Sequence, residues 1–125
     1  MEHSKKELIF IASSRRDLCD MPEKVRKDFG GALHGVQDGW KPDNAKALKG
    51  KAHGAIQLSE DHDGETYRAV FTVELEATVY VLHCSHKKSK KGSETPKKEI
   101  EVIEQRLKMA RALHEKRKGS KDGSN

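Results

Sequence analysis

The sequence is poor in the residues that would build a large core, a membrane span or a disulfide framework. Only 34% of its 125 residues are hydrophobic and only 5% are aromatic. None of its apolar runs approaches the ~20 residues that are needed to cross a bilayer. We therefore expect one small soluble domain, because a chain of this length buries enough surface for a single core.

Export signals and cysteine motifs are also absent. The first apolar stretch, residues 8–11, is shorter than the about 7–15 residues of a signal-peptide core. The two cysteines, Cys19 and Cys84, lie far apart in the chain and form no C-x-x-C pair. We expect free thiols and a cytoplasmic protein without a membrane segment.

Metal-ligand patterns are similarly sparse. The acidic stretch at 60–63, Glu-Asp-His-Asp, consists of consecutive residues at the tip of a predicted hairpin. No second cluster at helical spacing completes a ligand set, so the stretch is interpreted as an exposed turn. We expect neither a metal nor a cofactor.

Positive charge, in contrast, is plentiful and concentrated. The chain has a formal net charge of +5, and residues 86–98 alone carry six lysines against one glutamate. This local excess favours a surface that contacts phosphates, although a solvated loop would explain it equally well.

The apolar pattern predicts a strand, two helices, three antiparallel strands and a last helix. Ser14 is a candidate N-cap for the first helix, and Pro22 suits the first turn of the second. A stripe of apolar residues then recurs at helical spacing: Val25, Phe29, Ala32, Leu33 and Val36. Thr95 and Pro96 suit the start of the last helix, with an apolar stripe over residues 100–113.

The strands are predicted around a turn signal at Asp63-Gly64 and an unbroken apolar run at residues 79–82. Such a run is typical of a strand covered on both faces. Alternation places Arg68 and Tyr67 on opposite faces, and likewise His83 and His86. A salt bridge at the sheet edge is the structural alternative for Arg68. For Trp40, the only tryptophan, packing over a helix end is favoured over base stacking.

These elements predict an α+β fold with a small antiparallel, mixed-edge sheet of about four strands. An N-terminal helical hairpin and a C-terminal helix cover it. We assign residues 1–115 to one domain and residues 116–125 to a disordered polar tail, because the tail contains no large hydrophobic residue.

Three segments in this order resemble the RelE/ParE toxin superfamily: ALKG (47–50), TYRAVFTV (66–73) and VYVLHCSHKKSKKGSETPKKEI (79–100). The likeness is nearest to the phage-derived, HigB-like branch of type II toxin–antitoxin toxins and spans roughly residues 8–113. The first two motifs are short, whereas the lysine run followed by Thr-Pro and an amphipathic helix is more specific.

The resemblance implies a RelE-like fold and a metal-independent endoribonuclease that cuts mRNA in translating ribosomes. It also implies inhibition by a cognate helix-turn-helix antitoxin. The chemistry needs cations around the scissile phosphate and a group that moves a proton. The catalytic candidates are Arg68, Lys49, His83 and His86, and the RNA-binding candidates are Lys46, Lys51, Lys87, Lys88, Lys90 and Lys91.

Two other functions fit the same sequence. The first is poisoning of DNA gyrase through protein contacts, the other activity of the superfamily. The second is a plain nucleic-acid-binding module. The sequence also departs from superfamily RNases that use an aromatic residue near the C-terminus for proton transfer, because its last helix contains none.

Overall fold

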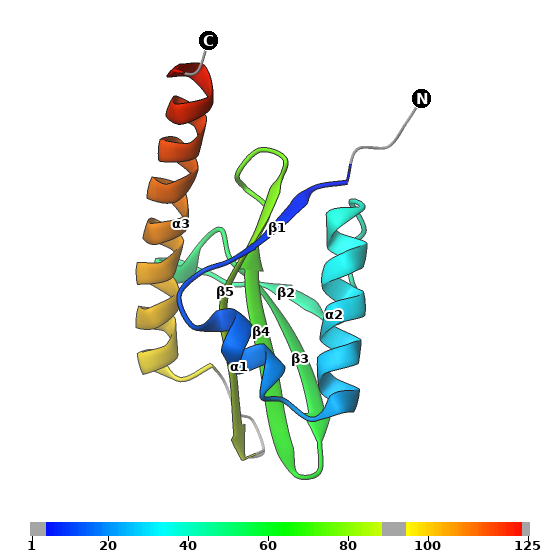
Figure 1. Ribbon diagram of the computed structural model, residues 1–125. Helices are drawn as coiled ribbons and strands as arrows, with labels where there is room; N and C mark the ends of the chain where they lie inside the picture. Colours follow the sequence, from blue (N-terminus) through cyan, green and yellow to red (C-terminus); the bar gives the residue numbers. More distant parts are fainter. Residues whose placement is uncertain (1–4, 89–94, 124–125) are drawn as a thin grey trace.

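A five-stranded sheet lies between two helical layers in the computed structural model, which describes residues 5–88 and 95–123 (Figure 1). The elements in chain order are β1 (Glu7–Phe10), α1 (Ser14–Cys19), α2 (Glu23–Gln37), β2 (Ala45–Ala47), the 3-10 turn η1 (Gly50–Ala52), β3 (Ile56–His62), β4 (Glu65–Thr72), β5 (Thr78–Lys88) and α3 (Lys97–Gly123). The predicted α+β class is confirmed, and the predicted elements occur in the expected order, with β2 and η1 in addition.

The strand order is β1-β5-β4-β3-β2, with β1 parallel to β5 and the other neighbours antiparallel. The sheet thus has one strand more than the four expected. The additional strand is β2, which lies in the lysine-containing segment between α2 and β3. Its three residues are too few to show a periodic pattern.

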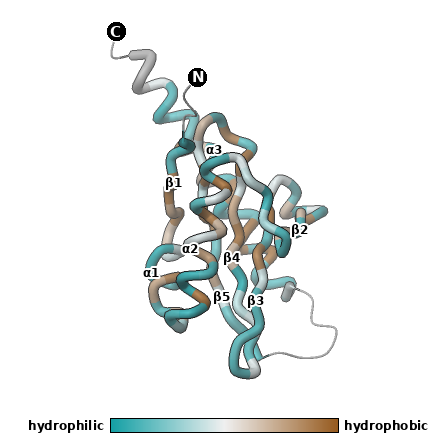
Figure 2. Tube along the Cα trace, turned by 90° about the vertical axis from the view of Figure 1, so that its right-hand side faces the viewer, coloured by the Kyte–Doolittle hydropathy of each residue, from teal (hydrophilic) through white to brown (hydrophobic). Residues whose placement is uncertain are grey.

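Alternation along the strands sorts the core into two layers. Tyr67, Ala69 and Phe71 of β4 pack with the α1–α2 hairpin, whereas Val70 packs with α3 and η1. We call these sides of the sheet the α2 face and the α3 face. The β5 run at residues 79–82 is fully buried, as predicted for a covered strand. Hydrophobic residues gather on the central strands, while the β3–β4 turn is hydrophilic (Figure 2).

A bulge interrupts the alternation in β5. Val70 pairs with His83 but Phe71 pairs with Val81, so Leu82 is the extra residue. Leu82 packs in the α3 layer, and His83 contacts Glu99 and Arg106 of α3. Leu82 and His83 are consecutive in sequence and yet lie on the same face. After this bulge the odd-numbered residues of β5 point to the α3 face.

The helical hairpin agrees with the predicted stripe, because Val25, Phe29, Leu33 and Val36 are buried. The predicted N-cap is wrong by one residue. Ser13 occupies the cap position of α1, while Ser14 is buried and donates a hydrogen bond to the Val81 carbonyl at 3.0 Å. Ser14 therefore fastens the helix to β5 instead of capping it.

Helix α3 is longer than expected and continues through residues 116–123, which the sequence assigned to a disordered tail. Cations in this part find partners on the sheet side of the molecule. Arg117 pairs with Glu7 of β1 at 2.8 Å, and Lys118 pairs with Glu76 at 3.6 Å. These pairs and the good helix propensity of lysine and arginine explain the extension without an apolar stripe. Within the described ranges, no helix has the length and apolarity that a membrane span requires.

Candidate functional site

Arg68 lies in the interior of the sheet on the α3 face, and its side chain has little contact with solvent. It is 3% exposed, and its Nη1 finds no hydrogen-bond partner among the described residues. Strand β4 lies between β3 and β5, so the alternative of an edge salt bridge is wrong. A buried guanidinium nitrogen without a partner is costly, and such groups in native proteins are expected to have a reason.

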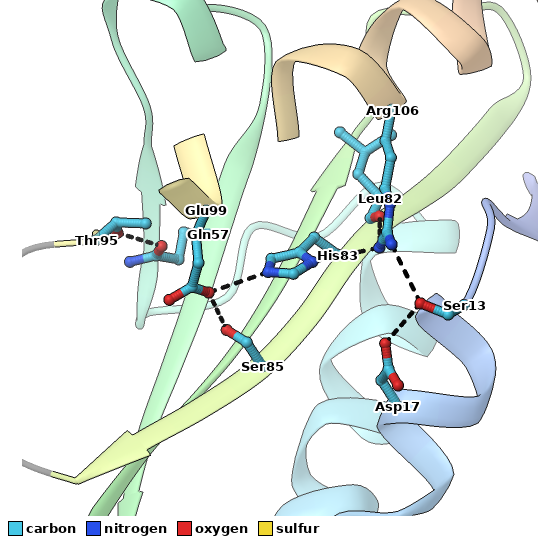
Figure 3. A network of polar contacts seen from close by, with 9 residues as sticks. All are labelled: Ser13, Asp17, Gln57, Leu82, His83, Ser85, Thr95, Glu99 and Arg106. Atoms are coloured by element: carbon cyan, nitrogen blue, oxygen red, sulfur yellow. Dashed lines mark hydrogen bonds and ion pairs between the residues drawn. The ribbon is translucent and has the colours of Figure 1, made fainter. Parts of the chain in front are cut away.

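Glu99, from the first turn of α3, reaches over the sheet beside Arg68. Its Oε1 accepts hydrogen bonds from His83 Nε2 at 3.0 Å and from the Ser85 hydroxyl (Figure 3). Ser85 pairs directly with Arg68 across β4 and β5. We call the group formed by Gln57, Arg68, His83, Ser85 and Glu99 the Arg68 site.

The Glu99 carboxylate is held in its ionised form. Burial raises the pKa of this carboxyl, but hydrogen bonds from His83 and Ser85 and the charge of Arg68 together outweigh burial. The net pKa of Glu99 is therefore lower than usual. A negative charge thus sits close to the buried cation in the free protein.

His83 is fixed in one tautomer by its two neighbours. Arg106 Nη1 lies 3.3 Å from Nδ1 and also donates to the Leu82 carbonyl at 3.0 Å. Since an arginine nitrogen only donates, Nδ1 accepts and Nε2–H donates to Glu99. The ring is mostly buried, with 13% of its side chain exposed. Its orientation is therefore set by both ends.

Arg106 connects this arrangement to the first helix. Its Nη2 donates to the Ser13 hydroxyl at 3.1 Å, and that hydroxyl donates to Asp17 at 2.8 Å. A continuous polar chain thus runs from α1 through α3 to β5 (Figure 3). These contacts tie α3, at Arg106, to α1 and β5.

Gln57 and Lys46 extend the site toward the β2 edge. Gln57 is buried and accepts a hydrogen bond from Thr95 at 2.7 Å, which fixes the entry to α3. Lys46 pairs with Gln57 across β2 and β3 and is exposed on the same face. The α3 face therefore carries a cation at the margin of the buried polar group.

The other predicted lysines are distributed around the molecule. Lys49 and Lys51 are exposed in and beside η1, which packs against α3 and so lies on the α3 side. Lys87 pairs with Thr66, two pairs beyond Arg68 and Ser85, and therefore shares their face. Lys88 points to the opposite face by alternation. Lys90 and Lys91 lie outside the described residues.

The two predicted histidines separate as alternation required. His86 lies on the α2 face, stacked on Tyr67 with ring centroids 5.3 Å apart, and contacts Glu65 at 2.6 Å. Only His83 is near Arg68. The sequence analysis did not identify Glu99 or Arg106 as site residues. Both lie on the apolar stripe of the last helix, where positions 99, 103, 106, 110 and 113 follow one another at spacings of four and three. Charged residues on an apolar stripe are the signal that points to them.

In the part of the chain that the structure describes, histidine, cysteine, aspartate and glutamate form no group of three able to hold a metal. The arrangement instead joins a buried cation, an ionised carboxylate and an oriented imidazole. These groups are suited to binding an oxyanion and transferring a proton beside it.

Comparison with solved structures places the fold among the RelE toxins. The toxin–antitoxin complex RelBE2 of Mycobacterium tuberculosis is 20% identical, with a TM-score of 0.50 over 70% of this chain and 98% of that chain. A free double mutant of the E. coli toxin RelE is 18% identical, with a TM-score of 0.53 over 84% and 97%. Isolated E. coli RelE is 18% identical, with a TM-score of 0.51 over 80% of this chain and 97% of that chain.

The search of curated proteins finds no match. The family described as phage derived protein Gp49-like (DUF891) matches residues 16–108, most of the chain. The predicted resemblance to a phage-derived branch with a RelE-like fold is confirmed. The chain therefore belongs to the Gp49-like family of phage-derived proteins and has the fold of the RelE toxins.

Proposed function

We propose that the chain is the toxin of a type II toxin–antitoxin system, of the HigB-like kind, and that it cleaves mRNA in the ribosome. The observation that carries the proposal is the buried, unpartnered Nη1 of Arg68 beside an oriented His83. The family membership and the RelE fold support it. The predicted cytoplasmic location and the helix-turn-helix antitoxin belong to the same proposal.

Arg68 binds the scissile phosphate in this proposal. Because the guanidinium is already desolvated, it gains strongly from a negative oxygen and needs little reorganisation as charge develops in the transition state. Lys87 and Lys46 flank Arg68 on the same face and bind neighbouring phosphates. Lys49 and Lys51 extend the basic surface on the α3 side.

His83 transfers the proton. Glu99 holds Nε2–H, so Nδ1 is the basic nitrogen, and it is engaged only by the long contact from Arg106. Nδ1 takes the proton of the 2′-hydroxyl as its oxygen attacks phosphorus, and Arg106 then gives up its contact with Nδ1 while keeping those with Leu82 and Ser13. The imidazolium, stabilised by the Glu99 carboxylate, then returns the proton to the leaving 5′-oxygen. The products are a 2′,3′-cyclic phosphate and a 5′-hydroxyl end.

The test is to map transcript 5′ ends after brief induction of the wild-type chain and of Arg68→Ala. We expect new 5′-hydroxyl ends within coding regions, growth arrest with the wild type, and loss of both in the variant. Lys24→Ala, on the exposed surface of α2, is the matched cation control and keeps both effects. Unaltered mRNA accompanied by a DNA-damage response would overturn cleavage and favour the gyrase alternative.

A further inference from the structure

A hollow on the α2 face lies away from the Arg68 site and has a volume of about 410 Å³. It is placed where the end of α2 meets the β2 edge of the sheet. Its apolar walls come from Val36, Trp40, Pro42, Ile56, Phe71 and Val73. We call it the Trp40 groove. Its size falls within the roughly 300–1,000 Å³ of ordinary ligand pockets.

The groove exposes large hydrophobic side chains that the core does not use. Trp40 is 74% exposed and Val73 is 38% exposed. Among the described residues, the other exposed large hydrophobic side chain is that of Met109, which lies on α3 outside the groove. The expectation that Trp40 packs over the helix end is therefore wrong. Exposed tryptophan beside an apolar hollow is typical of protein–protein interfaces, where tryptophan often dominates the binding energy.

Backbone contacts fix the main chain of Trp40 in the free protein, before any partner protein binds. Its N–H donates to the Gly35 carbonyl at 2.9 Å, directly after Gly39 with a φ of 92° ends α2. A glycine meets this left-handed conformation at little cost. The indole is therefore presented by an ordered helix end, which lowers the entropy lost on binding.

The charges on the groove are of one sign. Lys6 and Lys41 are the charged residues that line it, and neither forms an ion pair with a described carboxylate. Acidic side chains on a partner would complement them. Apart from these two ammonium groups and the indole N–H of Trp40, the lining side chains are hydrocarbon and include no acceptor that could read a base edge. An apolar side chain therefore fits the groove better than a nucleotide.

We propose that the Trp40 groove is the docking site for a segment of the antitoxin in which one or two large apolar side chains are flanked by Asp or Glu. This inference rests on the proposed function, since it identifies the contact surface of that toxin's partner. The groove belongs to the α2 layer and Arg68 to the α3 face, so the sheet separates them. The docked segment anchors the antitoxin without touching the Arg68 site.

The fluorescence of the single tryptophan reports directly on this contact. The probe is the purified helix-turn-helix protein encoded beside the gene of this chain, titrated into the full-length chain. The antitoxin is made as a tryptophan-free variant if needed. We expect a blue shift of Trp40 emission and protection from iodide quenching, because docking buries the indole.

Calorimetry of variants supplies the second measurement. Trp40→Ala and the double variant Lys6→Glu/Lys41→Glu should each weaken antitoxin binding at least tenfold, while their circular dichroism and RNA cleavage stay as in the wild type. Lys108→Glu, a charge reversal on exposed α3, is the matched control and binds normally.

Three results would overturn the proposal. The first is wild-type affinity in both groove variants together with unchanged emission. The second is an emission change with a single-stranded RNA oligonucleotide but not with the protein, which would make Trp40 a base-stacking residue. The third is a neighbouring gene whose product does not bind the wild-type chain. Cleavage by the free chain is measured separately, so failed docking and failed cleavage are distinguishable.

Discussion

On the α2 face, β4 packs Tyr67, Ala69 and Phe71 against a helical hairpin, whereas on the α3 face the same strand presents Arg68 beside Val70. The first layer is closed by hydrocarbon. The second combines a hydrocarbon core with a buried cation and its polar neighbours. Alternation along one strand thus separates the residues that stabilise the fold from those we propose for the chemistry. Single substitutions can test whether the separation is real.

The largest difference should appear in RNA cleavage by histidine variants of the two faces. We expect His83→Ala to lower the single-turnover rate roughly 10²–10⁴-fold, as is usual for loss of a proton-transfer group. His86→Ala should leave the rate unchanged, because this ring lies across the sheet from Arg68. Both variants are assayed on programmed ribosomes. Equal losses would break the assignment of the chemistry to the α3 face.

The free energy of unfolding should show the opposite pattern, with the larger loss for a substitution in the α2 layer. Phe29, buried in the α2 layer, should cost about 3–5 kcal/mol of unfolding free energy when replaced by alanine. Arg68→Met should cost much less when both variants are compared in urea denaturation, because the donor it removes has no partner, and the loss is confined to the charge that helps keep Glu99 ionised. A destabilisation by Arg68→Met as large as that by Phe29→Ala would make Arg68 a structural residue.

The pH dependence of stability should single out Glu99. Its pKa in the folded protein is lower than the 4.5 of the free side chain, because the hydrogen bonds from His83 and Ser85 and the charge of Arg68 outweigh burial. Its ionised form therefore stabilises the protein above pH 4.5, and this contribution is lost as the pH falls through the folded-state pKa. Urea titrations should show the wild type exceeding Glu99→Gln near neutrality, with the gap closing below pH 4.5. A gap that persists in acid would contradict this role.

Thiol reactivity gives the smallest and simplest contrast. Burial raises the pKa of Cys84 to about 12, and nearby Asp17 adds to the shift, whereas Cys19 is exposed. Ellman's reagent at pH 8 should therefore modify one thiol quickly in the folded protein and the second only after denaturation. Cys19→Ser should abolish the fast reaction. Fast modification in that variant would show that the α2 layer is open around Cys84.

Much of the fold could be predicted from the sequence because the sequence patterns behind it are local. The stripe from Val25 to Val36, the Asp63-Gly64 turn and the buried run at 79–82 each reflect periodicity or turn chemistry within a few residues. The pairing of β1 with β5 joins segments about 70 residues apart. The bulge at Leu82 and the short β2 depend on that tertiary context, and the sequence shows no pattern for either.

The candidate site could be predicted only in part, because it too depends on tertiary contacts. Arg68 stood out as a cation in an apolar strand, and the odd spacing of His83 and His86 correctly separated them. The role of Glu99 depends on where α3 crosses the sheet, which no local pattern encodes. Trp40 was misjudged because large aromatic side chains are usually buried, and an interaction surface reverses that expectation.

The place of β5 in the sheet bears on when the protein matures during synthesis. Strand β5 lies between β1 and β4, although it is the last of the five described strands to leave the ribosome. A nascent chain that ends before residue 78 contains β1 with its helices and the β2–β4 meander as two fragments that share no backbone pairing. The sheet is joined only when β5 inserts, and α3 emerges later still. Any activity that needs His83 and Glu99 together is therefore withheld until both β5 and the first turn of α3 have emerged.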